Sequence, residues 1–316
     1  MILAFALLAG AAIVGFTAPP VLNRLTTSQV APSVALAWWF ATGVSVVLTA
    51  VSGVVLLLVP GHGPARWLLD RVHECWSAMT HGSVPALDDV LGTFGALLVA
   101  GALARFGSAA FRRRSEAMKL HGRQLSLLRL AARRPSGDEP LMWLDHDQPL
   151  AYSVAGRPSF IVATTGLTGH LSDDQVAAVL AHERAHLRGR HHALTGIADA
   201  AASAMPFVPL MRQAPAAIRV LVEMAADSAA AAAHGAETVR SALLRVATGG
   251  SPAGALGMAD NGVELRLSRL ARASRPRPWL RAGALVATVV AAQAVPGVVG
   301  IGLFAVTSAW YCPILT

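Results

Sequence analysis

Long apolar stretches, separated by more polar segments, dominate the pattern along the chain. Four of them are apolar and long enough to cross the hydrocarbon core of a membrane as helices, which takes about 20 residues; they are residues 2–21, 34–59, 90–106 and 282–310. Between the third and the fourth, apolar and polar residues are mixed, as in a water-facing domain. The pattern predicts a mainly α integral membrane protein with about four transmembrane helices. An α+β domain is expected between spans three and four.

The first apolar stretch could be taken for a secretion signal, but it lacks two features of one. No basic residue precedes it, and it runs directly into Pro19 and Pro20 without a clear small-residue cleavage site. We therefore predict a retained helix.

Composition supports the membrane assignment. Hydrophobic residues make up 54% of the 316 residues and charged residues only 14%, which is too apolar for a soluble protein of this size. The net charge is +8, and basic residues gather beside apolar stretches, in 105–134 and 266–281, where aromatic residues are sparse. We expect contact with membrane lipid and no direct nucleic-acid binding.

The same basic residues predict how the chain is oriented. They flank the region between spans three and four, and an excess of Lys and Arg marks the cytoplasmic side of a membrane. We predict a multi-pass protein of the cell membrane with both termini outside. Its parts are a membrane region at 1–110, a cytoplasmic domain at 111–281, and a fourth span with a short extracytoplasmic tail at 282–316. Cys75 and Cys312 would then share the oxidising face, where a disulfide and two free thiols both stay open.

A helix start is predicted at Asp173. Ser172 can cap this helix, and Gln175 stands three residues further on, as in a capping box. Leu171 and Val176 occupy the positions of a hydrophobic staple. The apolar run that follows extends the helix into a His-Glu-x-x-His motif.

That motif is His182-Glu183-Arg184-Ala185-His186. Two histidines four residues apart lie on one face of a helix and can share one ion. Two cysteines are too few for a Cys-rich site, so a metal would use histidines and carboxylates. Zn2+ suits two imidazoles plus a third ligand, and Glu183 can serve as the catalytic base. The motif predicts a zinc metalloendopeptidase; a charged, solvated helix face is the alternative.

The third metal ligand has two candidates. His192 completes the metzincin pattern HExxHxxGxxH through Gly189. Alternatively Glu223 binds the metal, and Asp227, on the same face of an Ala-rich helix, orients a ligand histidine. We favour Glu223 and keep His192 as the alternative metal ligand. If Glu223 binds, the apolar segment 193–211 must be buried or re-entrant, because a single crossing would place Glu223 on the opposite side of the membrane.

The segment 158–166 has the β-branched character of a short strand that ends in a turn. As an edge strand beside the zinc helix it would pair with an extended peptide substrate through Ile161, Val162, Ala163 and Thr164. Simple core packing is the alternative.

Together these features resemble the BlaR/MecR-type membrane zinc metallopeptidase family, which includes β-lactam sensor-transducers, and more distantly the Ste24/HtpX-type membrane proteases. The most specific matching residues are Ala155-Gly156, Thr165-Gly166-Leu167, Leu171, Val179-Leu180-Ala181-His182-Glu183, Ala185-His186, Glu223 and Ala226-Asp227. The resemblance implies a gluzincin fold with His182, His186 and Glu223 on Zn2+. It also implies that Glu183 is the base and that Asp227 supports the metal ligands without binding the metal itself.

The resemblance further implies cleavage of a cytoplasmic protein, typically a winged-helix repressor, and thus an antirepressor role in signal transduction. The chain ends shortly after the fourth apolar stretch, so we expect no C-terminal penicillin-binding sensor domain. The activating signal, any involvement of β-lactams and formation of a homo-oligomer stay open. So does the oxyanion stabiliser, for which Tyr152 and His234 are weak candidates. The rival functions are an HtpX/Ste24-like quality-control protease and a non-catalytic membrane signalling scaffold.

Overall fold

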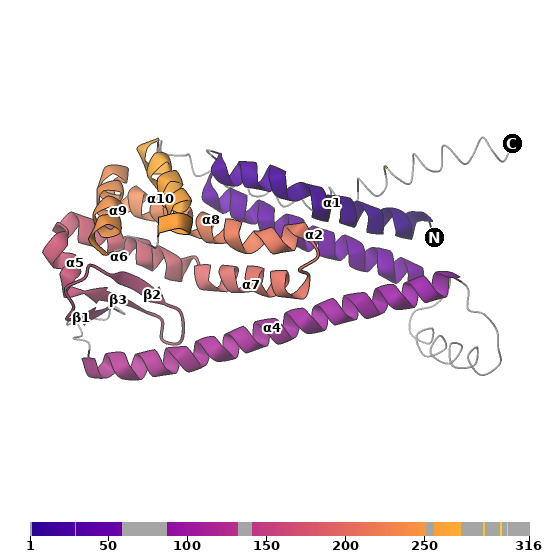
Figure 1. The fold of residues 1–316 in the computed structure, drawn as a ribbon, viewed down its shortest axis with the longest axis horizontal. Coiled ribbons are helices and arrows are strands. Elements are labelled where there is room, and N and C mark those ends of the chain that lie inside the picture. Colours follow the sequence, from indigo (N-terminus) through magenta and orange to yellow (C-terminus); the bar gives the residue numbers. More distant parts are fainter. Residues whose placement is uncertain are drawn as a thin grey trace.

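The computed structural model describes most of the chain. Its described residues are 2–28, 30–58, 87–131, 141–250 and 256–272, with the single positions 287, 298 and 302. Most of the predicted fourth span, most of the loop at 60–89, and Cys75 and Cys312 lie outside the described residues. The described part is mostly helical, with one small sheet at the end away from the N-terminus (Figure 1).

Within the described residues, three helices are long and apolar enough to cross a membrane. They are α1 (Ile2–Thr27), α2 (Pro32–Leu58) and the stretch Thr93–Arg123 within α4 (Leu87–Ala131). α1 and α2 lie side by side as a hairpin (Figure 1). The prediction of apolar helices at the first three spans is confirmed, and these helices indicate a membrane protein.

α1 runs through both prolines without a break and continues beyond residue 21, the predicted end of the first span. In this extension Leu22 and Thr26 are buried, and the Thr26 hydroxyl accepts a hydrogen bond from Trp39 Nε1 at 3.3 Å. Asn23 Nδ2 also donates to Gln213 Oε1 of a later helix at 3.2 Å. The extra turns are therefore held by protein contacts, which an estimate of span length from hydropathy alone does not include.

The sheet contains β1 (Leu141–Leu144), β2 (Ala151–Val154) and β3 (Phe160–Thr164) in the order β1-β3-β2. β3 pairs in parallel with β1 and antiparallel with β2, where Ser153 stands opposite Ile161. The short helix α5 (Thr165–His170) follows β3 directly.

The predicted edge position of the strand at 158–166 is wrong, because β3 is the central strand of the sheet. Its residues are buried on both faces, as is typical of a covered inner strand; they include the four positions proposed to pair with substrate, Ile161, Val162, Ala163 and Thr164. The backbone of β3 already pairs with a strand on each side. The edge strand that contacts the motif helix is β2.

The motif helix is α6 (Asp173–Arg188), and its predicted start is confirmed. The Ser172 hydroxyl accepts a hydrogen bond from the Gln175 N–H at 3.4 Å, and the Gln175 side chain accepts one from the Ser172 N–H at 3.1 Å. Leu171 and Val176 are buried in one apolar cluster with Ile161 of β3. This cluster fixes α6 against the sheet.

Two further helices, α7 (His191–Ala204) and α8 (Pro209–His234), form a hairpin that packs on α1 and α2. Buried residues of the shared core include Val14 and Trp39 from the membrane hairpin and Ile218 from α8. The apolar segment 193–211 comprises most of α7, the turn after it and the start of α8. α8 then returns to pack against α6, as the third-ligand hypothesis requires for Glu223.

α4 connects the membrane region with the sheet as one unbroken helix, and it passes the predicted boundary at residue 110 without interruption (Figure 1). Arg113 Nη1 lies 3.1 Å from Asp199 Oδ2 on α7, and the His121 ring lies 5.4 Å from the Phe160 ring of β3. Most of the described α4 side chains are exposed.

The last described elements are α9 (Ala236–Gly250) and α10 (Leu256–Ala271). Leu270 of α10 and Val239 of α9 are buried together with Ala181 of α6 and Ala230 of α8. These two helices therefore cover the side of α6 and α8 that faces away from α7 (Figure 1).

Candidate metal centre

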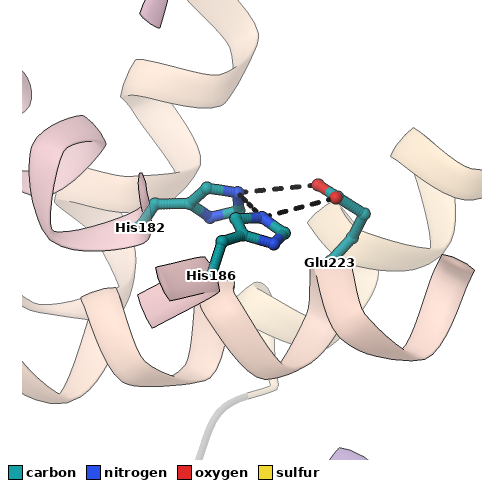
Figure 2. A group of neighbouring side chains, drawn as sticks. All are labelled: His182, His186 and Glu223. Atoms are coloured by element: carbon teal, nitrogen blue, oxygen red, sulfur yellow. Dashed lines mark hydrogen bonds and ion pairs between the residues drawn. The ribbon is translucent and has the colours of Figure 1, made fainter. Parts of the chain in front are cut away.

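Three side chains from α6 and α8 converge on one point (Figure 2). The two imidazole Nε2 atoms of His182 and His186 are 3.1 Å apart. Glu223 places Oε2 at 3.5 Å from the first and Oε1 at 3.4 Å from the second. The structure therefore brings the two motif histidines together with the favoured third ligand.

These spacings fit a tetrahedral zinc site. Zinc binds histidine nitrogen at about 2.0–2.1 Å and carboxylate oxygen at about 2.0–2.2 Å, so tetrahedral angles separate neighbouring donor atoms by about 3.3–3.5 Å. The three observed separations lie at or close to this range. Nitrogen and carboxylate oxygen in a two-to-one ratio are also a donor set that zinc accepts while keeping a fourth position open.

His182 is oriented by the residue predicted to lie behind it. Its Nδ1 lies 3.0 Å from Asp227 Oδ1, which leaves Nε2 facing the centre. Burial by itself lowers the pKa of His182, but the hydrogen bonds to Asp227 and Glu223 outweigh it and raise that pKa to about 9. Without a metal, the His182 ring is therefore protonated on both nitrogens at neutral pH, and a zinc ion must displace one of these protons.

His186 is held by a second histidine that the motif did not identify. Its Nδ1 lies 3.0 Å from Nδ1 of His191, so the two nitrogens share one hydrogen and the Nε2 of His186 faces the centre. Burial lowers the pKa of His186 to about 4 and also lowers that of His191. His186 is therefore neutral, in the state required of a ligand.

The turn between α6 and α7 makes this contact possible. A Cβ on Gly189 would stand 2.3 Å from the His191 ring, so the close approach requires glycine at this position. Arg190 follows with a positive φ of 50° and reverses the chain so that α7 starts at His191. Gly189, which suggested a metzincin pattern, serves here to admit His191.

The motif glutamate is tied to the edge strand. Glu183 accepts hydrogen bonds from the hydroxyl and from the backbone N–H of Ser153 on β2. Burial raises the pKa of Glu183, and this effect outweighs the opposing influence of His182 and Ser153. A carboxylate with a raised pKa is suited both to accept and to return a proton.

His192, the alternative third ligand, is not among the residues grouped at the centre in the described part of the chain. Its Nε2 lies 3.3 Å from Ser153 Oγ, and its ring is 6.4 Å from that of His186. Burial lowers the pKa of His192. The structure thus places His192 beside the edge strand.

Arg266 of α10 is the third functional contributor, after His191 and Ser153, that the sequence reasoning missed. Its Nε and Nη2 donate to the two oxygens of Asp227 at 2.7 and 2.9 Å, and its Nη1 lies 3.3 Å from Glu223 Oε2. Burial alone raises the pKa of each of these carboxyl groups, but their hydrogen bonds and the charge of Arg266 outweigh it and hold both values below the usual range.

The two weak candidates for an oxyanion stabiliser are not brought to the centre. Tyr152 precedes Ser153 on β2 and so points to the opposite face of the sheet, where it is exposed. His234 ends α8 eleven residues after Glu223, which places it about 16 Å further along the helix.

Comparison with known proteins points to the same chemistry. Residues 114–248 match Peptidase family M48, and the matched part includes all three residues of the centre. No solved structure matches the chain. The match supports a metalloprotease of a membrane-type family whose members are typically zinc-dependent.

Proposed function

We propose that the protein is a membrane zinc endopeptidase whose active site faces the cytoplasm. His182, His186 and Glu223 would bind the metal, and Glu183 would be the catalytic base. The observation that carries the proposal is the spacing of the donor groups on two packed helices: the two imidazole Nε2 atoms are 3.1 Å apart, and the two Glu223 oxygens lie 3.4 and 3.5 Å from them. When bound there, zinc would supply a Lewis acid that polarises the scissile carbonyl and eases deprotonation of the attacking water.

Glu183 would move the proton in this reaction. Ser153 holds its carboxylate on the side of α6 that faces β2. Glu183 takes a proton from the attacking water and gives it to the nitrogen of the scissile peptide bond as that bond breaks. The raised pKa of Glu183 helps the first half of this transfer, because a carboxylate of higher pKa is a stronger base toward the proton of the water.

β2 replaces β3 as the strand that we propose for substrate binding. It is the edge strand beside α6, and Ser153 in it contacts both Glu183 and His192. An extended peptide could pair with the edge of β2 that has no neighbouring strand in the described part of the chain. It would run past the metal centre, and backbone hydrogen bonds would hold it with little demand on its sequence. Glu223 is 38% exposed in its side chain, so the centre is open to such a chain.

For the substrate we propose a cytoplasmic regulatory protein, typically a winged-helix repressor, cleaved in signalling. This step is supported by the resemblance to the BlaR/MecR-type family at the motif residues. The rival is a protease of HtpX/Ste24 type with a broad set of damaged membrane proteins as substrates. The repressor-cleaving protease and the HtpX/Ste24-type protease would share the metal chemistry and would differ in how many proteins they cleave.

The test uses the full chain in detergent or nanodiscs, as wild type and as Glu183→Gln. Both should contain zinc by metal analysis, and the variant should lose about 10²–10⁴-fold in cleavage of a protein substrate, the range of a proton-transfer catalyst. A variant that cleaves at the wild-type rate would remove Glu183 as the base. Mass spectrometry of new protein N-termini in cells with either form then separates one cleaved regulator from many fragments.

A further inference from the structure

Arg266 connects α10 to both carboxylates of the metal centre. It contacts Asp227 through two nitrogens and Glu223 through the third, and its side chain is only 15% exposed. Glu223 and Asp227 are one helical turn apart on α8, so one guanidinium can fix both at once. Arg266 lies outside the residues that match the peptidase family.

The same helix is attached to the connection between the two membrane helices α1 and α2. Arg269 Nη1 donates to the carbonyl of Ser28 at 2.7 Å, and its Nη2 donates to the carbonyl of Val30. Arg269 follows Arg266 by three residues, so the two side chains leave α10 from neighbouring positions on one face. One turn of α10 therefore links the membrane hairpin to the metal ligands.

The connection that Arg269 contacts is itself ordered by local hydrogen bonds. The Ser28 hydroxyl donates to the Leu25 carbonyl at 2.7 Å and accepts from the Val30 N–H at 3.3 Å. The Ser28 carbonyl stands directly after the C-terminal end of α1, where the helix dipole favours a cation. Arg269 thus binds a defined feature of the membrane hairpin.

We propose that α10 positions the metal ligands according to the state of the α1–α2 hairpin, with Arg266 and Arg269 as the two positioning residues. The proposal rests on the zinc peptidase function proposed above. Arg266 acts on Glu223 directly and on His182 through Asp227. Arg269 contacts the α1–α2 connection, and it acts by setting the place of α10 and so of Arg266.

The geometry explains why the carboxylates need this support. Glu223 is partly exposed, and its carboxylate contacts are with His182, His186 and Arg266 in the described part of the chain. Both histidines are partners that share the metal with Glu223. Arg266 is a cation from a separate helix, so a shift of α10 would release the carboxylate toward solvent and away from the zinc position.

The test measures zinc affinity by competition with a chelating dye. It uses the full chain in detergent on the Glu183→Gln background, so that cleavage cannot interfere. Arg266→Gln should weaken zinc binding about 10–100-fold, the usual effect of losing a residue that orients metal ligands. Arg269→Gln should weaken it about fivefold, a typical coupling between separate sites. Arg272→Gln is the matched control, since the exposed side chain of this arginine donates a hydrogen bond to the Ser268 carbonyl within the same segment.

The decisive comparison is the double variant. Because Arg269 acts through Arg266, adding Arg269→Gln to Arg266→Gln should weaken zinc binding no further. Additive losses, or an Arg269→Gln protein with unchanged zinc affinity, would overturn the proposal even if its melting temperature falls. Arg269→Lys, which can bond one of the two carbonyls, should lose less than Arg269→Gln and serves if the latter does not fold. A Glu183→Gln parent that binds no zinc would overturn the proposed function and this inference together.

Discussion

α6 and α10 both present side chains to the metal centre, but they are held in place in different ways. α6 is fixed at each end, by the Ser172 capping box and by the Gly189 turn, and its apolar face is buried against the sheet. α10 buries Leu270 against α6, α8 and α9, and two of its arginines contact other elements. The two histidine donors of the centre thus lie on a helix that is stabilised by its own local sequence. The positive charge that pairs with the carboxylates, Arg266, lies on α10, and the position of α10 depends on contacts with elements far away in the sequence.

The largest expected effect tests the α6 side of this comparison. His186→Ala removes a donor atom, so zinc binding should fall below detection, whereas Arg266→Gln on α10 should only weaken it. Metal analysis and dye competition measure both. His192→Ala is the matched control and should bind zinc as the wild type does. The reverse result, loss with His192→Ala and retention with Glu223→Ala, would make His192 the third ligand.

Asp227 joins the two helices, so its loss should have an intermediate effect. Asp227→Asn keeps the shape but removes the charge that pairs with Arg266 and His182. We expect zinc affinity to fall about 10–100-fold. The variant should also lose most of the additional effect of Arg266→Gln, because the two residues act as a pair. Independent effects of the two substitutions would contradict the link between α8 and α10.

The pH dependence of zinc binding tests the raised pKa of His182. Its pKa is raised to about 9, so zinc competes with one proton over the whole neutral range. Apparent affinity should rise about tenfold per pH unit from pH 7 toward pH 9 and then level off. His186, with a pKa of about 4, adds no proton in that range. A flat profile between pH 7 and pH 8 would contradict the raised pKa.

The same shift affects the stability of the metal-free protein. A histidine whose pKa rises from 6.5 in the unfolded chain to about 9 stabilises the fold while it is protonated in the folded state. That contribution is fully present below pH 6.5 and is lost as the pH rises through about 9. The melting temperature of metal-free protein should therefore fall over this window, and Asp227→Asn should reduce the fall. Thermal unfolding with a chelator present measures both.

The smallest expected effect concerns the edge strand. Ser153→Ala removes one hydrogen bond to Glu183 but leaves the backbone N–H in place. We expect kcat to drop about two- to tenfold, the range of one hydrogen bond, with zinc affinity unchanged. Tyr152→Phe, on the opposite face of β2, is the control. A loss of zinc instead of rate would place Ser153 in the metal site and not with the base.

Local signals predicted one part of this site well. The start of α6 depends on residues within a few positions of Ser172, and the spacing of His182 and His186 places them on one face without reference to the rest of the fold. Glu223 and Asp227 could be favoured because the pair repeats helical spacing in an Ala-rich segment. Their convergence with α6 depends on packing of α8, which spacing alone does not determine.

The parts that could not be predicted depend on distant contacts. The edge position assigned to β3 was wrong because strand order depends on pairing with β1 and β2, and the uninterrupted apolar character of β3 was the signal of a central strand. Arg266 stands 39 residues after its partner Asp227, among basic residues that were assigned to membrane orientation. His191 had a signal in the sequence, because a glycine with a histidine two residues later comes directly after the motif helix.

X-ray absorption at the zinc edge of the full chain, on the Glu183→Gln background, tests the central claim most directly. The account predicts two imidazoles and oxygen donors at about 2.0–2.2 Å, no sulfur, and the same spectrum for His192→Ala. The Glu223→Ala protein should lose an oxygen donor or the metal itself. A spectrum with three imidazoles, one of them removed by His192→Ala, would contradict the assignment of His182, His186 and Glu223 as the ligands.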